Sequence, residues 1–469
     1  MGMDKRRIWK RITAIFLAVV LGSMAPVMPA AAVNANGAIA RGIDVSKHNG
    51  LINWGQVAAS GVQFTFIKVG STNSGIDPYF VHNITNANAA GVKTGVYIYS
   101  YATTPEQAAE EANLVLQWID GYTVNYPIVF DIEDKNQRNL SSQEQINLIN
   151  AFCSVIDAAG YYPMVYSSKN WFVQKLSTVG WDKWVAQYNT SCEYNNNVCF
   201  WQNTSSGSVS GISGRVDLNY QYKDYSSLII QEGFLNHNGG TRFYSNWRMQ
   251  RGWVNYNDTR YYLDGAGNLV RGWYSDDSGT YYLTPADGQI ARGQYPVEGG
   301  DYYFTAEGVK TTGWVTIEDR KYYYEPANNG IMKRDWMSDD KGNFYFFDRT
   351  AGHMLTGAQV IDQGEYLFSA DGIRQHGLIT LETGASYYDP ATGMKMRGWI
   401  TLEDRTYYAN EQGLIVTGVY EINKQLYYFN PDGTLVRNQP VELEGVPYQV
   451  NEEGILVPIV PEEPAAPAA

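Results

Sequence analysis

Three acidic side chains follow a short apolar run in PIVFDIEDKN, residues 127–136, where Asp131, Glu133 and Asp134 fall within four positions. Because the side chains of a strand alternate between its two faces, Asp131 and Glu133 point the same way and Asp134 points the other way. Crowding and partial burial raise the pKa of one such carboxyl and leave its neighbours ionised. A pair of this kind can supply the proton donor and the ionised carboxylate that glycoside hydrolysis requires.

The elements that must position these acids lie in residues 41–228, where strand-like and helix-like segments alternate. Helices are expected over 103–120, with Thr104 as the N-cap, and over 141–160, with Ser141 or Ser142 as the cap and Gly160 as the stop. Strands are expected at 42–46, 64–69, 94–100, 127–133, 162–168, 183–188, 199–203 and 216–221. This α/β alternation predicts a mainly parallel, closed barrel, irregular because its last three strands leave little room for helices.

In a parallel barrel the functional groups gather at the C-terminal edge of the strands. Asp44 lies near the end of the first strand, Asp131 and Glu133 end the fourth, and Asp217 begins the last. We therefore expect the four carboxyls to share one pocket, with a sugar-binding set of aromatic and amide side chains nearby. That set is Tyr97, Tyr99, Tyr166, Trp184, Tyr188, Trp201 and Gln202. The alternative is that one or two of these acids only bond backbone or pair with Lys or Arg.

The second half of the chain follows a different pattern. After an expected linker at 229–241, residues 242–456 repeat a unit of roughly 20 residues with Gly-Trp, then Tyr-Tyr, then an Asp-Gly-like turn. Such units predict short β-hairpins that stack into a solenoid, because one hairpin cannot bury its own apolar face. Repeated aromatic residues are usually core. Aromatic faces in a row can also bind sugars or cations, and the candidates are Trp253, Trp273, Trp314 and Trp336.

The chain ends and the composition limit the function. Residues 1–32 have the basic, apolar and small-residue regions of a cleaved export signal, the alternative being an uncleaved membrane anchor. Residues 457–469 are expected to be a disordered tail. The net charge of −13 argues against nucleic acid as a partner, and no motif indicates a metal or cofactor. In an exported protein, Cys192 and Cys199 can form a small-loop disulfide or remain free.

The segments GIDVSKHNGLINW, FTFIKVG, GVYIYSYA, PIVFDIED, YPMVYSS, WVAQY, FWQNTSSG and VDLNYQ, in that order, resemble the family-25 glycoside hydrolases, which are lysozymes of the Chalaropsis type. The resemblance covers about residues 41–228 and implies an irregular (β/α)5(β)3 barrel. It implies a muramidase that cleaves the β-1,4 bond between N-acetylmuramic acid and N-acetylglucosamine in peptidoglycan. It also implies that Glu133 is the proton donor, that Asp44, Asp131 and Asp217 assist, and that Tyr166 steadies the intermediate or the N-acetyl group.

The repeats resemble the choline- and glucan-binding cell-wall repeats of Gram-positive surface proteins. The resemblance implies a cell-wall polymer as partner, such as a choline-bearing teichoic acid or a glucan, and a secreted or wall-associated protein with no membrane attachment after signal cleavage. Positions 294, 358, 378 and 419 carry Gln, Ala, Leu and Val where that pattern has Trp, so a full array of choline sites is not expected. The rival functions are a non-catalytic wall-binding or adhesion protein and a glycosidase for another wall polysaccharide. The sequence leaves the retaining, inverting and substrate-assisted mechanisms open.

Overall fold

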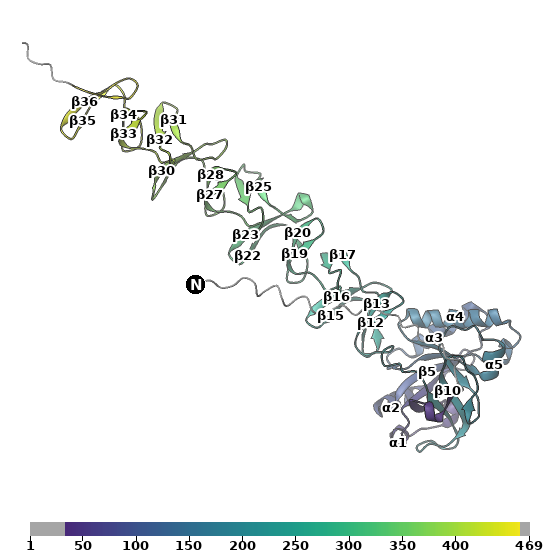
Figure 1. The fold of residues 1–469 in the computed structure, drawn as a ribbon. Helices are drawn as coiled ribbons and strands as arrows, with labels where there is room; N and C mark the ends of the chain where they lie inside the picture. The colour runs from purple at the N-terminus through teal and green to yellow at the C-terminus, as the bar shows by residue number, and fades with distance from the viewer. Residues whose placement is uncertain (1–32, 460–469) are drawn as a thin grey trace, which may run out of the picture. The chain divides into compact units, whose positions relative to one another are not determined.

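The computed structural model describes residues 33–459, which divide into two compact units, one up to Val270 and one from Arg271 (Figure 1). The expected export signal, 1–32, lies outside the described residues. The expected tail at 457–469 falls within them only for 457–459, where residues 457 and 458 belong to a strand. Within 33–459, no helix is both long and apolar enough to cross a bilayer.

The first unit is built on a closed barrel of eight strands. Its strands are β2 (Ala40–Val45), β3 (Phe64–Ser71), β5 (Lys93–Tyr99), β6 (Ile128–Asp131), β7 (Pro163–Ser168), β8 (Lys183–Ala186), β10 (Val198–Gly207) and β11 (Val216–Gln221). Neighbouring strands pair in the order β2-β11-β10-β8-β7-β6-β5-β3, and a parallel β2–β3 pair closes the ring. Only β11 runs antiparallel to its two barrel neighbours.

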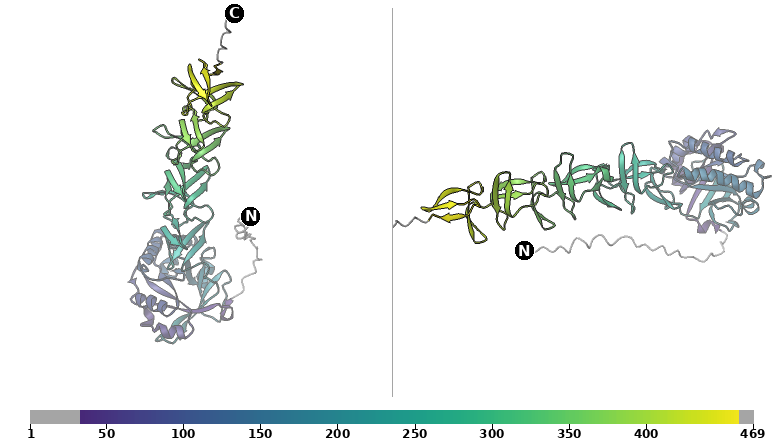
Figure 2. Two further views of the ribbon diagram at one scale, coloured as in Figure 1. Left: turned by 90° about the vertical axis from the view of Figure 1, so that its left-hand side faces the viewer. Right: turned by 90° about the horizontal axis from the view of Figure 1, so that it is seen from above.

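Five helices follow the first five barrel strands one by one and pack on the outside of the barrel (Figures 1 and 2). They are α1 (Trp54–Ala59), α2 (Phe80–Ala89), α3 (Pro105–Trp118), α4 (Ser142–Ala158) and α5 (Lys169–Gln174). The strands β8, β10 and β11 then follow without α-helices between them. The (β/α)5(β)3 prediction is therefore confirmed. The short elements are β1 (Val33–Asn34), β4 (Gly75–Ile76), β9 (Ser191–Cys192), η1 (Ala35–Gly37), η2 (Lys47–Asn49) and η3 (Lys135–Gln137).

The ends of the two long helices follow the local signals in the sequence. Thr104 caps α3 by accepting a hydrogen bond from the backbone N–H of Gln107, and Pro105 occupies the first helical position. Ser141 and Glu144 form a reciprocal capping box at the start of α4. Gly160, at φ +90°, follows the end of α4 in the left-handed region that stops a helix.

Aromatic side chains fill the barrel interior. Phe66 stacks on Trp184 with ring centroids 4.5 Å apart, and Phe64 meets Phe200 edge-on at 5.1 Å. The neighbouring strands must come close to these rings. A Cβ added at Gly42 would lie 2.4 Å from the Phe64 carbonyl oxygen, so that position requires glycine. A separate apolar cluster between the strands and the helices completes the core.

The first hairpin after the barrel packs against α4. It consists of β12 (Gly233–His237), β13 (Gly240–Ser245) and β14 (Arg248–Met249), so the segment expected to be a linker holds β12 and the start of β13. His237 Nε2 lies 2.8 Å from Asp157 Oδ1, and Arg242 donates to the Asp157 carbonyl oxygen at 3.0 Å. The hairpin of β15 (Gly252–Tyr256) and β16 (Thr259–Leu263) follows in the same unit.

The second unit consists of short antiparallel hairpins, as the repeats predict. Their strands are β17 (Gly272–Asp276), β18 (Gly279–Leu283), β19 (Gly293–Val297), β20 (Gly300–Phe304), β21 (Lys310–Thr311), β22 (Gly313–Ile317), β23 (Arg320–Glu325), β24 (Ile331–Met332), β25 (Asp335–Ser338), β26 (Phe344–Phe347), β27 (Gly357–Ile361), β28 (Gly364–Phe368), β29 (Gly377–Leu381), β30 (Gly384–Tyr388), β31 (Gly398–Leu402), β32 (Arg405–Ala409), β33 (Gly418–Ile422), β34 (Gln425–Phe429), β35 (Gln439–Leu443), β36 (Val446–Val450) and β37 (Leu456–Pro458). The short helix η4 (Pro326–Asn328) follows β23.

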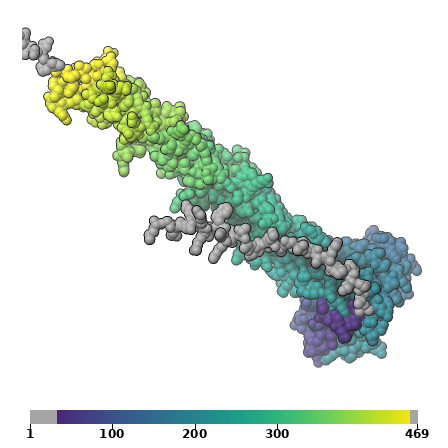
Figure 3. Space-filling model, viewed as in Figure 1, coloured from purple at the N-terminus to yellow at the C-terminus, as the bar shows by residue number. Residues whose placement is uncertain are grey.

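Successive hairpins are joined by backbone hydrogen bonds and shared apolar clusters. The segment after β32 bonds back to β30 through Ile415 N–H and the Ala385 carbonyl oxygen, 2.8 Å apart. Tyr387 of β30 and Tyr407 of β32 pack in one buried cluster. The colours in Figure 3 show that the hairpins of the second unit succeed one another in chain order. Each hairpin thus buries its apolar face against its neighbours.

Candidate active site

The four acids singled out in the sequence meet at one end of the barrel. Asp44 on β2 is the register partner of Asp217 on β11, so both side chains lie on the same face of the sheet. Asp131 is the last residue of β6, and Glu133 follows two positions later. The four acids line one cavity of about 220 Å³, together with Ser46, His48, Lys68, Tyr97, Tyr99, Tyr166, Trp184, Tyr188 and Gln202.

Two amide side chains hold the Asp44 carboxyl in place. Gln202 Nε2 donates to Asp44 Oδ1 at 2.9 Å, and Asn219 Nδ2 donates to the same oxygen at 2.7 Å. The indole N–H of Trp184 in turn donates to Asn219 Oδ1 at 2.7 Å, which fixes the orientation of that amide. Asp44 is only 5% exposed, so these bonds replace the water that a carboxyl would otherwise bind.

Two tyrosines complete this network on the side of β7 and β8. The hydroxyls of Tyr166 and Tyr188 donate to Gln202 Oε1 at 2.9 and 3.2 Å. Because Gln202 accepts from both tyrosines, its NH₂ group must face Asp44. The network holds rigid acceptor and donor groups around the cavity, as a site that orients sugar hydroxyls requires.

Burial raises the pKa of the acids in the cavity. The pKa of Asp44 rises to about 8, first because the carboxyl is buried and second because Asp217 lies nearby, while the Asn219 and Gln202 bonds oppose the rise. Burial also raises the pKa of Asp217. One or more of these carboxyls therefore holds a proton at neutral pH, which general acid catalysis requires.

Asp131 and Glu133 affect each other's charge and differ in their access to the cavity. Burial is the main cause of the raised pKa of Asp131, Glu133 adds to it, and Lys68 opposes it. Burial likewise raises the pKa of Glu133, while the positive charges of Lys68 and Arg138 oppose the rise. Asp131 is 4% exposed, and its Oδ1 has no hydrogen-bond partner within residues 33–459, whereas Glu133 is only half-buried. Glu133 is therefore the more accessible acid of this pair.

The cavity also contains a lysine that we did not expect. Lys68 on β3 lies with its ammonium 5.0 Å from the centre of the Tyr99 ring. Burial lowers the pKa of Lys68, and Asp131 and Asp77 oppose that effect. The signal was present in the strand period, because Phe64 and Phe66 point into the barrel and Lys68 continues the same face.

Trp201 does not line the cavity, which corrects its assignment to the sugar-binding set. Its ring lies in the cluster between strands and helices, and its indole N–H donates to the Gln187 carbonyl oxygen at 2.8 Å. Neighbouring residues of β10 point to opposite faces, so Gln202 faces the cavity and Trp201 cannot. Asp134 does not line the cavity either: its carboxylate caps η3 and accepts a hydrogen bond from the Tyr99 hydroxyl at 3.3 Å.

Of the two alternatives for Cys192 and Cys199, the structure shows the unbonded one, because both residues are free, buried thiols. Cys199 packs inside the barrel with Phe200 and Tyr225. Cys192 packs in the other cluster, between the strands and the helices, and pairs with Val33 on β1. The sheet separates the two clusters, so the two sulfur atoms lie on opposite sides of it although the residues are only seven positions apart in the sequence.

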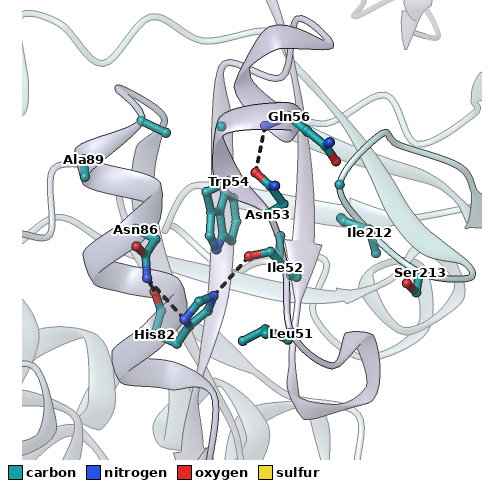
Figure 4. A pocket seen from close by; sticks show the side chains of 13 residues that line it. Leu51, Ile52, Asn53, Trp54, Gln56, His82, Asn86, Ala89, Ile212 and Ser213 are labelled. Carbon is teal, nitrogen blue, oxygen red and sulfur yellow. Dashed lines mark hydrogen bonds between the residues drawn. The ribbon is translucent and has the colours of Figure 1, made fainter.

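A larger groove of about 780 Å³ lies beside α1 and α2 and has no acid in its lining (Figure 4). His82 is its titratable side chain. Its Nε2 lies 3.0 Å from the Ile52 carbonyl oxygen, and its Nδ1 lies 3.2 Å from Asn86 Nδ2. Both ring nitrogens are engaged and no carboxyl lines this groove, so the smaller cavity with its four acids is the candidate active site.

In the repeats, tryptophans meet aromatic rings of their own hairpin and of the next one. Trp273 lies 5.0 Å from both Tyr282 and Tyr302. The same arrangement surrounds Trp314 and Trp336, with ring distances of 5.0 to 5.3 Å. It also surrounds Trp399, which we had not named among the ligand-binding candidates.

Two tryptophans of the repeats, Trp253 and Trp273, already have a cationic side chain of the chain over their rings. The guanidinium of Arg260 lies 4.2 Å from the Trp253 ring, and Lys310 Nζ lies 5.3 Å from Trp273. The rings therefore present faces suited to a cation. Trp314 and Trp399 remain 46% and 42% exposed.

The comparisons with known families agree with this division of the chain. Residues 43–212 match the glycosyl hydrolases family 25. Residues 252–269 match a cell wall binding repeat, and residues 311–356 match a choline-binding repeat. The chain belongs to glycosyl hydrolase family 25 and carries choline-binding cell-wall-binding repeats after the hydrolase domain.

Similar proteins each match about two fifths of this chain. The protein YegX of Escherichia coli K12 is 31% identical over 188 residues, which are 38% of this chain and 68% of YegX. Lysozyme M1 of Streptomyces globisporus is 30% identical over 199 residues, 38% of this chain and 66% of that protein. Among solved structures, the modular autolysin LytC of Streptococcus pneumoniae is 30% identical, with 39% of this chain and 46% of that chain covered and a TM-score of 0.36.

Proposed function

We propose that this protein is a secreted muramidase that hydrolyses the β-1,4 bond between N-acetylmuramic acid and N-acetylglucosamine in peptidoglycan. The observation that carries the proposal is the set of four carboxyls, with raised pKa values, around one cavity. The similarity to a lysozyme at 30% identity supports the same substrate. The residue boundaries of the proposed domains are 1–32 for the export signal, 41–228 for the barrel and 242–456 for the repeats.

In this proposal, Glu133 donates its proton to the leaving glycosidic oxygen. Burial raises the pKa of Glu133, which favours the protonated form that a proton donor needs. Asp131, Asp44 and Asp217 orient the substrate or the attacking group, and those of them that are ionised stabilise the positive charge that develops at the anomeric carbon. The hydroxyl of Tyr166, already fixed by Gln202, lies on the same cavity wall and orients the substrate.

The repeats attach the enzyme to the wall in this proposal. Exposed tryptophan faces with a tyrosine on each side suit the quaternary ammonium of a choline-bearing polymer. Binding by many weak sites on one chain raises the local concentration of the barrel at its substrate. The protein would then be found outside the cell, associated with the wall.

The test is Glu133→Gln in the full chain, with release of reducing ends from purified peptidoglycan as the measurement. Loss of the general acid should lower the rate by about 10²- to 10⁴-fold. Glu110→Gln, on the exposed face of α3, is the matched control and should retain full activity. Mass spectrometry of the products must show N-acetylmuramic acid at the new reducing end. Wall binding without soluble products from the unaltered chain would instead support a non-catalytic adhesion protein.

A further inference from the structure

A second hollow lies beside the catalytic cavity and contains two cations. It has a volume of about 270 Å³, and we call it the basic groove, defined by its lining residues Arg138, Ser168, Asn170, Trp171, Gln174 and Lys175. It belongs to the same end of the barrel as the acids. Ser168 ends β7 two residues after Tyr166, and Ser167 Oγ donates to the carbonyl oxygen of Ile132, the residue between Asp131 and Glu133.

Buried hydrogen bonds fix the walls of the basic groove. Gln145 of α4 has no exposed surface, and its Nε2 donates to the carbonyl oxygens of Gln137 and Leu140 at 2.9 and 3.1 Å. Its Oε1 accepts the indole N–H of Trp171 at 2.5 Å. Lys175 Nζ donates to the Leu140 carbonyl oxygen at 3.1 Å, so its ammonium is held at the groove. One buried amide therefore ties the loop after β6 to α5, and the groove is preorganised.

The charge of the basic groove contrasts with its surroundings. The chain carries a net charge of −13, and the neighbouring cavity is lined by four acids. The groove is lined by Arg138 and Lys175 and by no acidic residue. Neither cation forms an ion pair with a carboxylate of the chain within the range that the structure covers, 33–459. Two cations that form no ion pair, one of them held in place by the Leu140 carbonyl oxygen, are suited to an anionic ligand.

We propose that the basic groove binds a free carboxylate of the peptide stem attached to the muramic acid residue of the substrate. The inference rests on the proposed muramidase function, since it assigns a position to the part of that substrate outside the glycan. Arg138 and Lys175 would accept the carboxylate in charge-assisted hydrogen bonds, and the Trp171 ring would pack against the apolar part of the stem. The groove would make the enzyme prefer glycan that carries stems over bare glycan.

The test compares Lys175→Gln, Lys175→Arg and the unaltered full chain on two substrates. One is purified peptidoglycan with intact stems, and the other is the same glycan after an amidase has removed the peptides. Losing one charge-assisted bond should lower kcat/KM about tenfold on stem-bearing glycan for Lys175→Gln and less than threefold on bare glycan. Lys175→Arg should retain the activity. Arg138 is unsuitable as the first probe, because its charge also affects the pKa of Glu133.

The control is Lys135→Gln, which removes a charge from the neighbouring η3 outside the groove and should not change the substrate preference. An equal loss on both substrates for Lys175→Gln would overturn the inference. A loss that disappears when hydrofluoric acid strips phosphate polymers from the wall would overturn it too, in favour of a phosphate ligand. If the unaltered chain cleaves neither substrate, the muramidase proposal fails by itself. Calorimetric titration with N-acetylmuramyl-L-alanyl-D-glutamate then tests the basic groove directly. The inference requires that Lys175→Gln bind this compound more weakly than the unaltered chain does.

Discussion

Replacing Asp44 by Asn should stabilise the barrel, and the gain should grow with pH. The side chain keeps its shape, and its Oδ1 can still accept the hydrogen bonds from Gln202 and Asn219 at 2.9 and 2.7 Å. What changes is the charge. In the folded barrel the pKa of Asp44 is about 8, raised by burial and by Asp217, from an ordinary value of 3.8. The folded state thus holds the proton of Asp44 over a pH range in which the unfolded chain has released it.

The sign and the magnitude follow from proton linkage. Because the folded-state pKa is raised, the stability that Asp44 contributes is fully present below about pH 4 and is lost as the pH rises through about 8. Each pH unit in that window costs about 1.4 kcal/mol, so the interval from pH 5 to pH 8 has an upper limit of about 4 kcal/mol. Since the neighbouring acids share the protons, we expect Asp44→Asn to gain about 2 to 4 kcal/mol over the unaltered chain in this interval.

Urea denaturation of the full chain, followed by circular dichroism at 222 nm, measures this difference. The signal reports the barrel, because the α-helices within residues 33–459 all lie between Trp54 and Gln174. Glu110→Gln, an exposed change on α3, is the control and should shift stability by less than about 0.5 kcal/mol at every pH. A difference between Asp44→Asn and the unaltered chain that stays constant from pH 5 to pH 8 would refute the reasoning, since Asp44 would then titrate alike in both states.

Two further predictions concern the parts that follow the barrel. The free energy of unfolding of a chain of residues 33–230 should be about 1 to 3 kcal/mol lower than that of a chain of 33–270. The shorter chain lacks His237 and Arg242, which are the partners of Asp157. Equal melting temperatures for the two chains would show that the hairpin contributes nothing. Trp399→Ala should weaken retention of the full chain on a choline resin by about 3- to 10-fold. Trp253→Ala, at a ring already covered by Arg260, should have a smaller effect, and the reverse order would contradict the proposed role of the exposed rings.

Local patterns predicted the elements well because local interactions determine them. Thr104 and Ser141 begin their helices where the capping signals lie. Alternation along the strand expected at 127–133 placed Asp131 and Glu133 on one side and Asp134 on the other. In the structure β6 ends at Asp131, but Asp131 and Glu133 still both line the cavity and Asp134 caps η3. The hairpins of the repeats follow from their turn and aromatic residues in the same way.

Predictions failed more often where they depended on whether a strand residue points into the barrel or toward the helices. Trp201 was assigned to the cavity from its neighbour Gln202, but the two point to opposite sides of β10. Cys192 and Cys199 are close in sequence, yet the barrel wall separates them. Lys68 was overlooked because only the closed barrel shows that the strand face it shares with Phe64 and Phe66 ends in the acidic cavity.

The sequence by itself determined the two-part organisation, the order of strands and helices, and the acids on which the proposed chemistry depends, because propensity, capping and alternation act over a few residues. Only the tertiary structure decided that Asp44 and Asp217 lie opposite each other, that their burial raises their pKa values, and that Lys68 and the basic groove lie beside them. Burial and charge–charge interactions depend on groups that are distant in the chain and near in space, and closure of the barrel brings those groups together.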